Sequence, residues 1–117
     1  MRAKEIGIKG EEFARSFFEE QGFSILSKNF RFGRVGEIDL IVRKDNVVLF
    51  VEVKSRRFDA YGGALYAISP SKKRKLKTVA NAFLRLNPDI NNKNMIFRFD
   101  LLAINNESHE WVQDILR

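Results

Sequence analysis

Residues 36–55, GEIDLIVRKDNVVLFVEVKS, decide the fold of this chain. Residues 37–43 and 47–54 are two runs rich in β-branched and other apolar side chains, and Lys44-Asp45-Asn46 between them is typical of a tight hairpin turn. The apolar residues of both runs are nearly continuous, as they are in strands that are buried on both faces of a sheet. The stretch therefore predicts a β-hairpin in the middle of the sheet.

Charged residues interrupt these apolar runs at matching places. A two-residue turn at 45–46 places Asp39 opposite Glu52 and Glu37 opposite Lys54. Directly opposed residues project to one face, with Cβ atoms about 4.5–5.5 Å apart, so Asp39 and Glu52 repel each other unless a cation lies between them. Mg²⁺ or Mn²⁺, which prefer oxygen ligands, suit such a pair of carboxylates. The hairpin therefore predicts a divalent-metal site.

Lys54 adds a third group to this predicted site. It lies two residues after Glu52, so a regular strand projects both side chains to the same face. Its ammonium can neutralise a phosphate, or orient and help to deprotonate an attacking water, while the metal supplies Lewis acidity. These are the parts needed for phosphodiester hydrolysis. The alternative is that Asp39, Glu52 and Lys54 are solvated charges at strand ends that share a local salt bridge.

Outward from the hairpin, helical and extended segments alternate. Apolar periodicity and capping signals predict, in chain order, a helix over 9–21 ended by Gly22, a strand over 23–31, the hairpin, a helix from Ser69-Pro70 to Asn87-Pro88, a strand over 95–104, and a last strand or helix over 110–116. The order helix, three strands, helix and one or two strands predicts a single α/β domain, residues 1–117, whose central mixed sheet is flanked by helices. Arg98 and Asp100 share a strand face and are expected to form a structural ion pair, and Trp111 is expected in the core.

Composition narrows the class of protein. The chain has 117 residues, no Cys and one His, so a disulfide framework, a thiolate metal site and zinc hydrolase chemistry are not expected. No signal-like N-terminal segment and no apolar run long enough to cross a bilayer is present, so we expect a soluble, cytoplasmic protein without a membrane partner. The net charge of +6 favours an anionic partner, nucleic acid ahead of a ribosome or an acidic membrane surface.

Four short motifs resemble the YraN-like family of small bacterial proteins over nearly the whole chain. They are Gly36-Glu37-Ile38-Asp39-Leu40-Ile41, Phe50-Val51-Glu52-Val53-Lys54-Ser55-Arg56, Lys9-Gly10-Glu11 with Ala14, and Arg98-Phe99-Asp100. That family consists of predicted endonucleases that are similar to archaeal Holliday-junction resolvases, within the PD-(D/E)xK superfamily. The resemblance implies a restriction-endonuclease-like fold. Ile38 stands where the superfamily pattern has Pro.

The resemblance also implies roles for individual residues. Asp39 and Glu52 would be metal ligands, the backbone carbonyl of Val53 would complete the metal site, and Lys54 would be the catalytic lysine. The partners implied are DNA and a second copy of the chain, because junction-cleaving relatives act as dimers.

Two acidic positions leave alternatives open. Resolvase-like relatives carry an acid on the first helix, and Glu11 and Glu12 compete for this role. Glu11 borders the buried helix face and Glu12 points away from it, so we prefer Glu11 as a catalytic residue; the alternative is a first-turn Glu stabilised by the helix dipole. Glu37 would hold Lys54, bind a second metal or simply pair with the lysine.

Basic and aromatic residues flank the predicted site. The basic run that opens the second helix opposes the helix dipole, and a bound phosphate would reverse that effect; the alternative is a solvated charged face. Tyr61 would stack on an exposed base or, alternatively, cover the core. The predicted nucleic-acid contacts are Arg31, Arg34, Arg56, Arg57, Tyr61, Lys72, Lys73, Arg74 and Lys75.

The function expected from these features is a metal-dependent endonuclease that acts on DNA. Branched or otherwise structured DNA is the expected substrate, because a compact chain with few loops has little material for reading base sequence. The alternative is a non-catalytic nucleic-acid-binding or assembly protein that retains the fold. RNA is a further alternative, since nothing in these residues concerns the 2′-hydroxyl.

Overall fold

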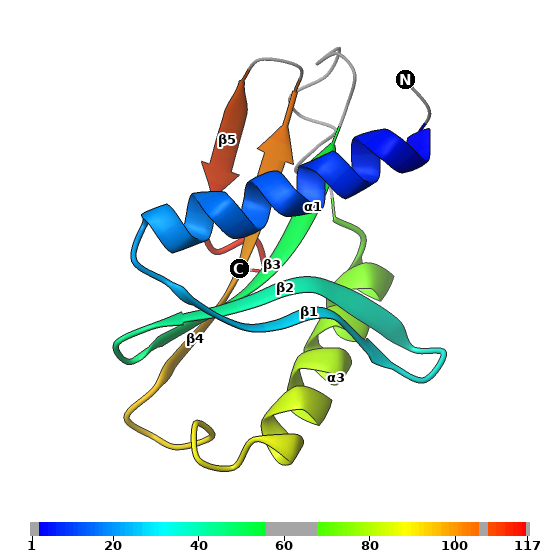
Figure 1. Ribbon diagram of the computed structural model, residues 1–117. Coiled ribbons are helices and arrows are strands. Elements are labelled where there is room, and N and C mark those ends of the chain that lie inside the picture. The colour runs from blue at the N-terminus through cyan, green and yellow to red at the C-terminus, as the bar shows by residue number, and fades with distance from the viewer. Residues whose placement is uncertain (1–2, 56–67, 106–107, 117) are drawn as a thin grey trace.

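The computed structural model describes residues 3–55, 68–105 and 108–116, with side chains from residue 10 onward (Figure 1). Its elements in chain order are α1 (Ala3–Glu20), β1 (Ser24–Phe32), β2 (Gly36–Lys44), β3 (Val47–Ser55), α3 (Pro70–Leu86), β4 (Ile96–Ile104) and β5 (His109–Val112). This order confirms the predicted mixed α/β class, and the last segment begins as a strand.

The five strands form one sheet in the order β1-β2-β3-β4-β5. The β3–β4 pair is parallel and the other three pairs are antiparallel, so the sheet is mixed and β3 lies at its centre. The β2–β3 hairpin has the register predicted from a turn at 45–46, with pairs running from Lys44–Val47 to Leu40–Val51. Asp45 in the turn has φ 54°, a left-handed conformation that Asp tolerates better than most residues.

The two helices cover opposite faces of the sheet (Figure 1). On one face, α3 packs the side chains of Leu76, Val79 and Phe83 against the sheet, and on the other, α1 packs Ala14 and Phe18. This explains the continuous apolar runs of β2 and β3, which have an apolar layer on each side. A five-stranded mixed sheet flanked by two helices is compatible with the restriction-endonuclease-like fold.

Local signals define the ends of the helices. Ser69 caps α3, because its hydroxyl accepts a hydrogen bond from the Lys72 backbone N–H at 3.1 Å, and Pro70 opens the helix. Asn87 ends α3, and Gly22, with φ 95°, follows α1 in the conformation that favours glycine. Neither helix is both long and apolar enough to span a bilayer within the described ranges.

A buried carboxylate ties the far edge of the sheet to α1. Asp100 is 0% exposed and forms the predicted ion pair with Arg98, whose Nε and Nη2 each donate to it at 2.8 Å. Asp100 also accepts from the Trp111 indole N–H at 2.8 Å and from the Asp114 backbone N–H at 3.0 Å. The half-buried Trp111 ring packs edge-on against Phe18 of α1. The network therefore fixes β4, β5 and α1 relative to one another.

Candidate metal centre

Strand β2 is irregular at Asp39. Residues two apart in a regular strand share a face, yet Ile38 packs on the α3 side of the sheet and Leu40 on the α1 side. Across from Asp39 on β1, Asn29 has φ 53° and interrupts the sequence of paired residues. The sequence prediction assumed regular strands, and the irregularity re-aims the Asp39 side chain.

The Asp39 carboxylate lies in the gap where β2 and β3 separate. Their pairing ends at Leu40–Val51, one residue short of Asp39, and Asp39 Oδ2 accepts a hydrogen bond from the Val53 backbone N–H at 2.8 Å. A strand N–H points within the sheet toward the neighbouring strand, so the carboxylate replaces the missing partner. The N–H and C=O of one strand residue point to the same edge, and the Val53 carbonyl is therefore directed into this gap.

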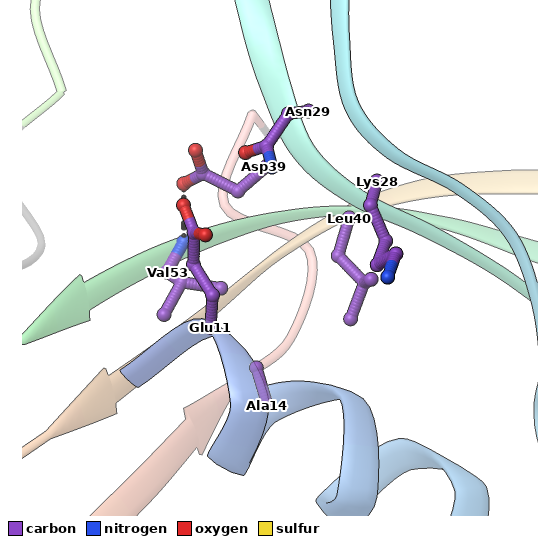
Figure 2. A pocket seen from close by; sticks show the side chains of 7 residues that line it. All are labelled: Glu11, Ala14, Lys28, Asn29, Asp39, Leu40 and Val53. Carbon is purple, nitrogen blue, oxygen red and sulfur yellow. Dashed lines mark hydrogen bonds between the residues drawn. The ribbon is translucent and has the colours of Figure 1, made fainter. Parts of the chain in front are cut away.

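Glu11 of α1 lies on the other wall of the same pocket (Figure 2). The carboxyl groups of Glu11 and Asp39 point toward each other there. A pocket of about 20 Å³, room for one water or one ion, is lined by Glu11, Ala14, Lys28, Asn29, Asp39, Leu40 and Val53. Glu12 does not line it. Gly10 of α1 lies close to the end of β3, where a Cβ would require the Ser55 hydroxyl to rotate and would lie 3.2 Å from the Ser55 Cβ.

Asn29 is a site residue that the sequence prediction missed. With its amide nitrogen facing the acids, Asn29 donates to Glu37 Oε1 at 3.0 Å and to Glu11 Oε1 at 3.2 Å. Glu37 also forms a salt bridge with Arg31 at 3.2 Å. Among the described residues its salt-bridge partner is therefore Arg31, and not Lys54 as expected. No motif marks Asn29, although Asn is one of the few residues that readily adopts its left-handed backbone conformation.

Glu52 approaches the gap from the α3 side of the sheet. It is 6% exposed, and its Oε2 lies 4.0 Å from Lys54 Nζ and 3.6 Å from Lys72 Nζ. The first contact fits the expectation that Glu52 and Lys54 project to one face. The contact with Lys72 was not expected, since that lysine was predicted only as part of a phosphate-binding run.

Burial and the neighbouring carboxylates affect the pKa of Asp39. Burial, the largest cause, and the charges of Glu52, Glu37 and Glu11 raise the pKa of Asp39 from 3.8 to about 6, although the Val53 N–H opposes the rise. Carboxylate oxygens and a backbone carbonyl are the donors that Mg²⁺ and Mn²⁺ prefer, so the donor chemistry fits a divalent cation.

The described side chains do not form a cluster of three acidic or histidine ligands. Within the described ranges, no three Asp, Glu or His side chains already surround one point closely enough to hold an ion. A cation shared with Asp39 would compete with Lys54 and Lys72 for the Glu52 carboxylate.

The raised pKa predicts that Asp39 destabilises the protein at neutral pH when no cation is bound. A rise of about two pKa units corresponds to about 3 kcal/mol. Because the folded-state pKa lies above the unfolded value, this penalty is absent below pH 3.8 and is complete above pH 6. We expect Asp39→Asn, which can still accept from Val53, to raise the free energy of unfolding in EDTA by about 2–3 kcal/mol at pH 7.5 and by little at pH 4.

Urea unfolding at the two pH values measures this difference. Asp45→Asn in the exposed hairpin turn is the matched control, with no expected gain at either pH. An equal free energy of unfolding for wild type and Asp39→Asn at pH 7.5 would contradict the predicted cost of ionising Asp39.

The predicted nucleic-acid contacts that the structure describes lie on two neighbouring elements. Arg31 and Arg34 are exposed at the end of β1 and in the β1–β2 turn. The turn leads into Gly36, where a Cβ would lie 3.6 Å from the side chain of Val79 and 4.0 Å from that of Lys75, both on α3. The basic first turns of α3, which carry Lys72, Lys73, Arg74 and Lys75, therefore lie beside the β1–β2 turn. The remaining predicted contacts, Arg56, Arg57 and Tyr61, lie outside the described residues.

Comparison with known proteins identifies the family. Residues 10–104 match the family model described as "Uncharacterised protein family UPF0102". The chain belongs to the UPF0102 family. The match confirms the predicted YraN-like membership, and its range includes Glu11, Asp39 and Glu52 of the candidate centre.

Several UPF0102 proteins from other organisms are similar to this chain over most of its length. The UPF0102 protein of Caldicellulosiruptor saccharolyticus is 39% identical over 104 residues, which cover 89% of this chain and 85% of that protein. The one from Chloroherpeton thalassium is 43% identical over 98 residues, 84% of this chain and 73% of the relative. The UPF0102 protein of Neisseria gonorrhoeae is 40% identical over 110 residues, which cover 93% of this chain and 92% of that protein. Family membership therefore extends over nearly the full length of this UPF0102 chain.

Proposed function

We propose that this UPF0102 protein is a divalent-metal-dependent endonuclease that hydrolyses phosphodiester bonds of branched or otherwise structured DNA. The observation that carries the proposal is the meeting of Glu11, Asp39 and the Val53 backbone at one small pocket between β2 and β3. Glu52 and Lys54 lie beside this pocket on the same central strand, and Glu52 contributes to the raised pKa of Asp39. The carboxylates of Glu11 and Asp39 meet there, and the nearby charge of Glu52 adds to the cost of ionising Asp39, which favours a functional role.

Each residue of the centre has a role that its position supports. Asp39, Glu52 and the carbonyl of Val53 would hold Mg²⁺ or Mn²⁺. The cation, when bound, supplies positive charge to the phosphate and lowers the pKa of a water. Glu11, on the opposite wall, orients that water. Lys54, whose side chain is 45% exposed, reaches the scissile phosphate and neutralises the charge that develops as water adds to phosphorus and the bond to the sugar oxygen breaks.

The surface beside the centre suits a DNA backbone. The exposed β1–β2 turn and the first turns of α3 carry basic side chains in adjacent positions, and the whole chain has a net charge of +6. Such a surface contacts phosphates without reading base sequence, so the selectivity of the enzyme would lie in DNA shape. A homodimer would present two such surfaces and two centres to a branched substrate.

Metal binding and cleavage together test this function. We expect calorimetric titration with Mn²⁺ to show one binding site in the wild type. Glu52→Gln removes a ligand charge and is expected to weaken Mn²⁺ binding by about tenfold or more. Glu12→Gln is the matched control on the exposed face of α1 and is expected to leave binding unchanged. The same proteins are assayed with Mg²⁺ or Mn²⁺ on duplex, flap and four-way-junction DNA, where only wild type and Glu12→Gln are expected to cut.

A wild type that binds DNA but cuts none of these substrates with either metal would reject the nuclease. The protein would then be a non-catalytic nucleic-acid-binding or assembly protein that retains the fold. The contacts of Lys54 and Lys72 with Glu52 fit this second function as structural salt bridges. Cleavage of matched RNA substrates but not of DNA would move the activity to the other nucleic acid.

A further inference from the structure

Lys72 differs from the other basic residues that open α3. Its Nζ lies 3.6 Å from Glu52 Oε2, whereas none of the salt bridges among the described residues includes Lys73, Arg74 or Lys75. The backbone of Lys72 is fixed by the Ser69 cap, so its side chain extends from a defined point toward the centre. Lys72 therefore belongs to the candidate metal centre and not only to the basic surface.

Glu52 has more positive charge around it than one carboxylate requires. Its side chain is 8% exposed, and two ammonium groups from different elements lie within 4.0 Å of the same oxygen, Oε2. The side chains of Lys54 and Lys72 are 45% and 44% exposed, so either ammonium reaches water easily. A divalent cation bound to Glu52 would supply both positive charges and repel the two lysines. A cation at this carboxylate would therefore weaken its contacts with Lys54 and Lys72.

Lys72 is well placed for a second partner once its contact with Glu52 weakens. Its side chain extends from the first turn of α3, and exposed Arg74 and Lys75 follow on the same helix. A lysine ammonium on a flexible stem pairs well with a phosphate as a point charge. The ligand chemistry that fits this position is a phosphodiester of the nucleic-acid backbone.

We propose that Lys72 alternates between two anions: it pairs with Glu52 when no cation is bound there, and with a substrate phosphate when a divalent cation binds Glu52. This inference deepens the proposed function and rests on it. It makes Lys72 a residue that couples metal binding to DNA binding. The coupling arises because the cation and Lys72 compete for the Glu52 carboxylate. When the cation occupies that carboxylate, the Lys72 ammonium becomes available to a DNA phosphate.

Binding measurements with Ca²⁺ test the coupling without cleavage as a readout. The variants are Lys72→Met and, as the matched control one residue along the same helix turn, Lys73→Met. DNA affinity for a four-way junction is measured in EDTA and in saturating Ca²⁺, and Ca²⁺ and Mn²⁺ affinities are measured by calorimetry. Both substitutions remove one positive charge, so the loss of charge alone affects both variants equally.

The expected result is a loss that depends on the cation. Lys72→Met is expected to weaken DNA binding by less than about threefold in EDTA and by about tenfold in Ca²⁺, whereas Lys73→Met weakens it equally in both. Lys72→Met is also expected to bind Mn²⁺ about three- to tenfold more tightly than wild type, because the competing ammonium is gone. Lys72→Arg is expected to restore the Ca²⁺-dependent DNA affinity at least in part.

Three results would overturn this inference. They are the same DNA-binding loss for Lys72→Met in EDTA and in Ca²⁺, Mn²⁺ binding that is unchanged or weaker in Lys72→Met, and the absence of any cation binding in the wild type. Failure of the proposed function gives a different result. A wild type that binds Ca²⁺ and DNA but never cuts DNA with Mg²⁺ would contradict the nuclease function. The binding measurements on Lys72→Met would still test the coupling, because they do not depend on cleavage.

Discussion

Replacing Asp39 with Asn is expected to abolish metal-dependent DNA cleavage while DNA binding persists. Asp39 is the carboxylate that lies in the gap between β2 and β3, held by the Val53 N–H and facing Glu11 (Figure 2). Loss of a residue that only supports a metal ligand costs about 10- to 100-fold, and loss of the ligand itself is expected to cost about 1,000-fold or more. The substitution removes a negative charge near the substrate, so DNA affinity should stay the same or rise by a few fold.

Single-turnover cleavage and equilibrium binding on the same junction separate the two effects. Asp45→Asn in the exposed hairpin turn makes the same chemical change on the same hairpin and is expected to cut at the wild-type rate. The metal-site interpretation would be wrong if Asp39→Asn cut within about tenfold of the wild type. A parallel loss of cutting and of DNA binding would instead assign Asp39 to the fold or to the binding surface.

The second large effect concerns stability and not chemistry. Asp100→Asn is expected to lower the free energy of unfolding by about 2–3 kcal/mol, because Asp100 is 0% exposed and a neutral amide cannot replace all the hydrogen bonds that its two oxygens accept. Each carboxylate oxygen of Asp100 accepts two hydrogen bonds: Oδ1 from Arg98 and the Asp114 N–H, and Oδ2 from Arg98 and the Trp111 N–H. In Asp100→Asn an NH₂ donor replaces one of these oxygens, and Arg98 loses its negatively charged partner. For a domain of this size the expected fall in Tm is about 10 °C or more.

Thermal unfolding at pH 7.5 checks this, with the exposed Asp89→Asn in the turn after α3 as the control. A fall in Tm of less than about 3 °C for Asp100→Asn would show that the network adds little to stability. The effect should also reach the centre: Trp111 packs on Phe18 of α1, and α1 carries Glu11. Loosening this contact is therefore expected to lower cleavage at temperatures where the protein remains folded.

Local signals in the sequence were sufficient for the elements and their order. The turn at 45–46 set the hairpin register because a two-residue turn leaves only one pairing, and the Ser69-Pro70 and Asn87-Pro88 signals bounded α3 because capping depends on neighbouring residues. The continuous apolar runs placed β2 and β3 inside the sheet for the same local reason. The Arg98–Asp100 pair followed from the strand period alone.

The details of the candidate centre depended on tertiary structure. The sequence named Asp39, Glu52, Lys54 and Glu11, but regular alternation could not show that β2 changes face at Asp39 or that Asn29 links Glu11 to Glu37. It also could not separate Lys72 from its basic neighbours, because a run of like charges carries no information on which member reaches a buried acid.

What the sequence by itself determined, then, is the set of elements, their order, the hairpin register and the residues of the central motif. What only the tertiary structure decided is which side chains meet: Glu11 with Asp39 across the pocket, Asn29 with two acids, and Lys72 with Glu52. The physical reason is range. Turns, caps and strand periods act over a few residues, whereas these contacts join α1, β1 and α3 to the central strands and depend on how the helices pack on the two faces of the sheet.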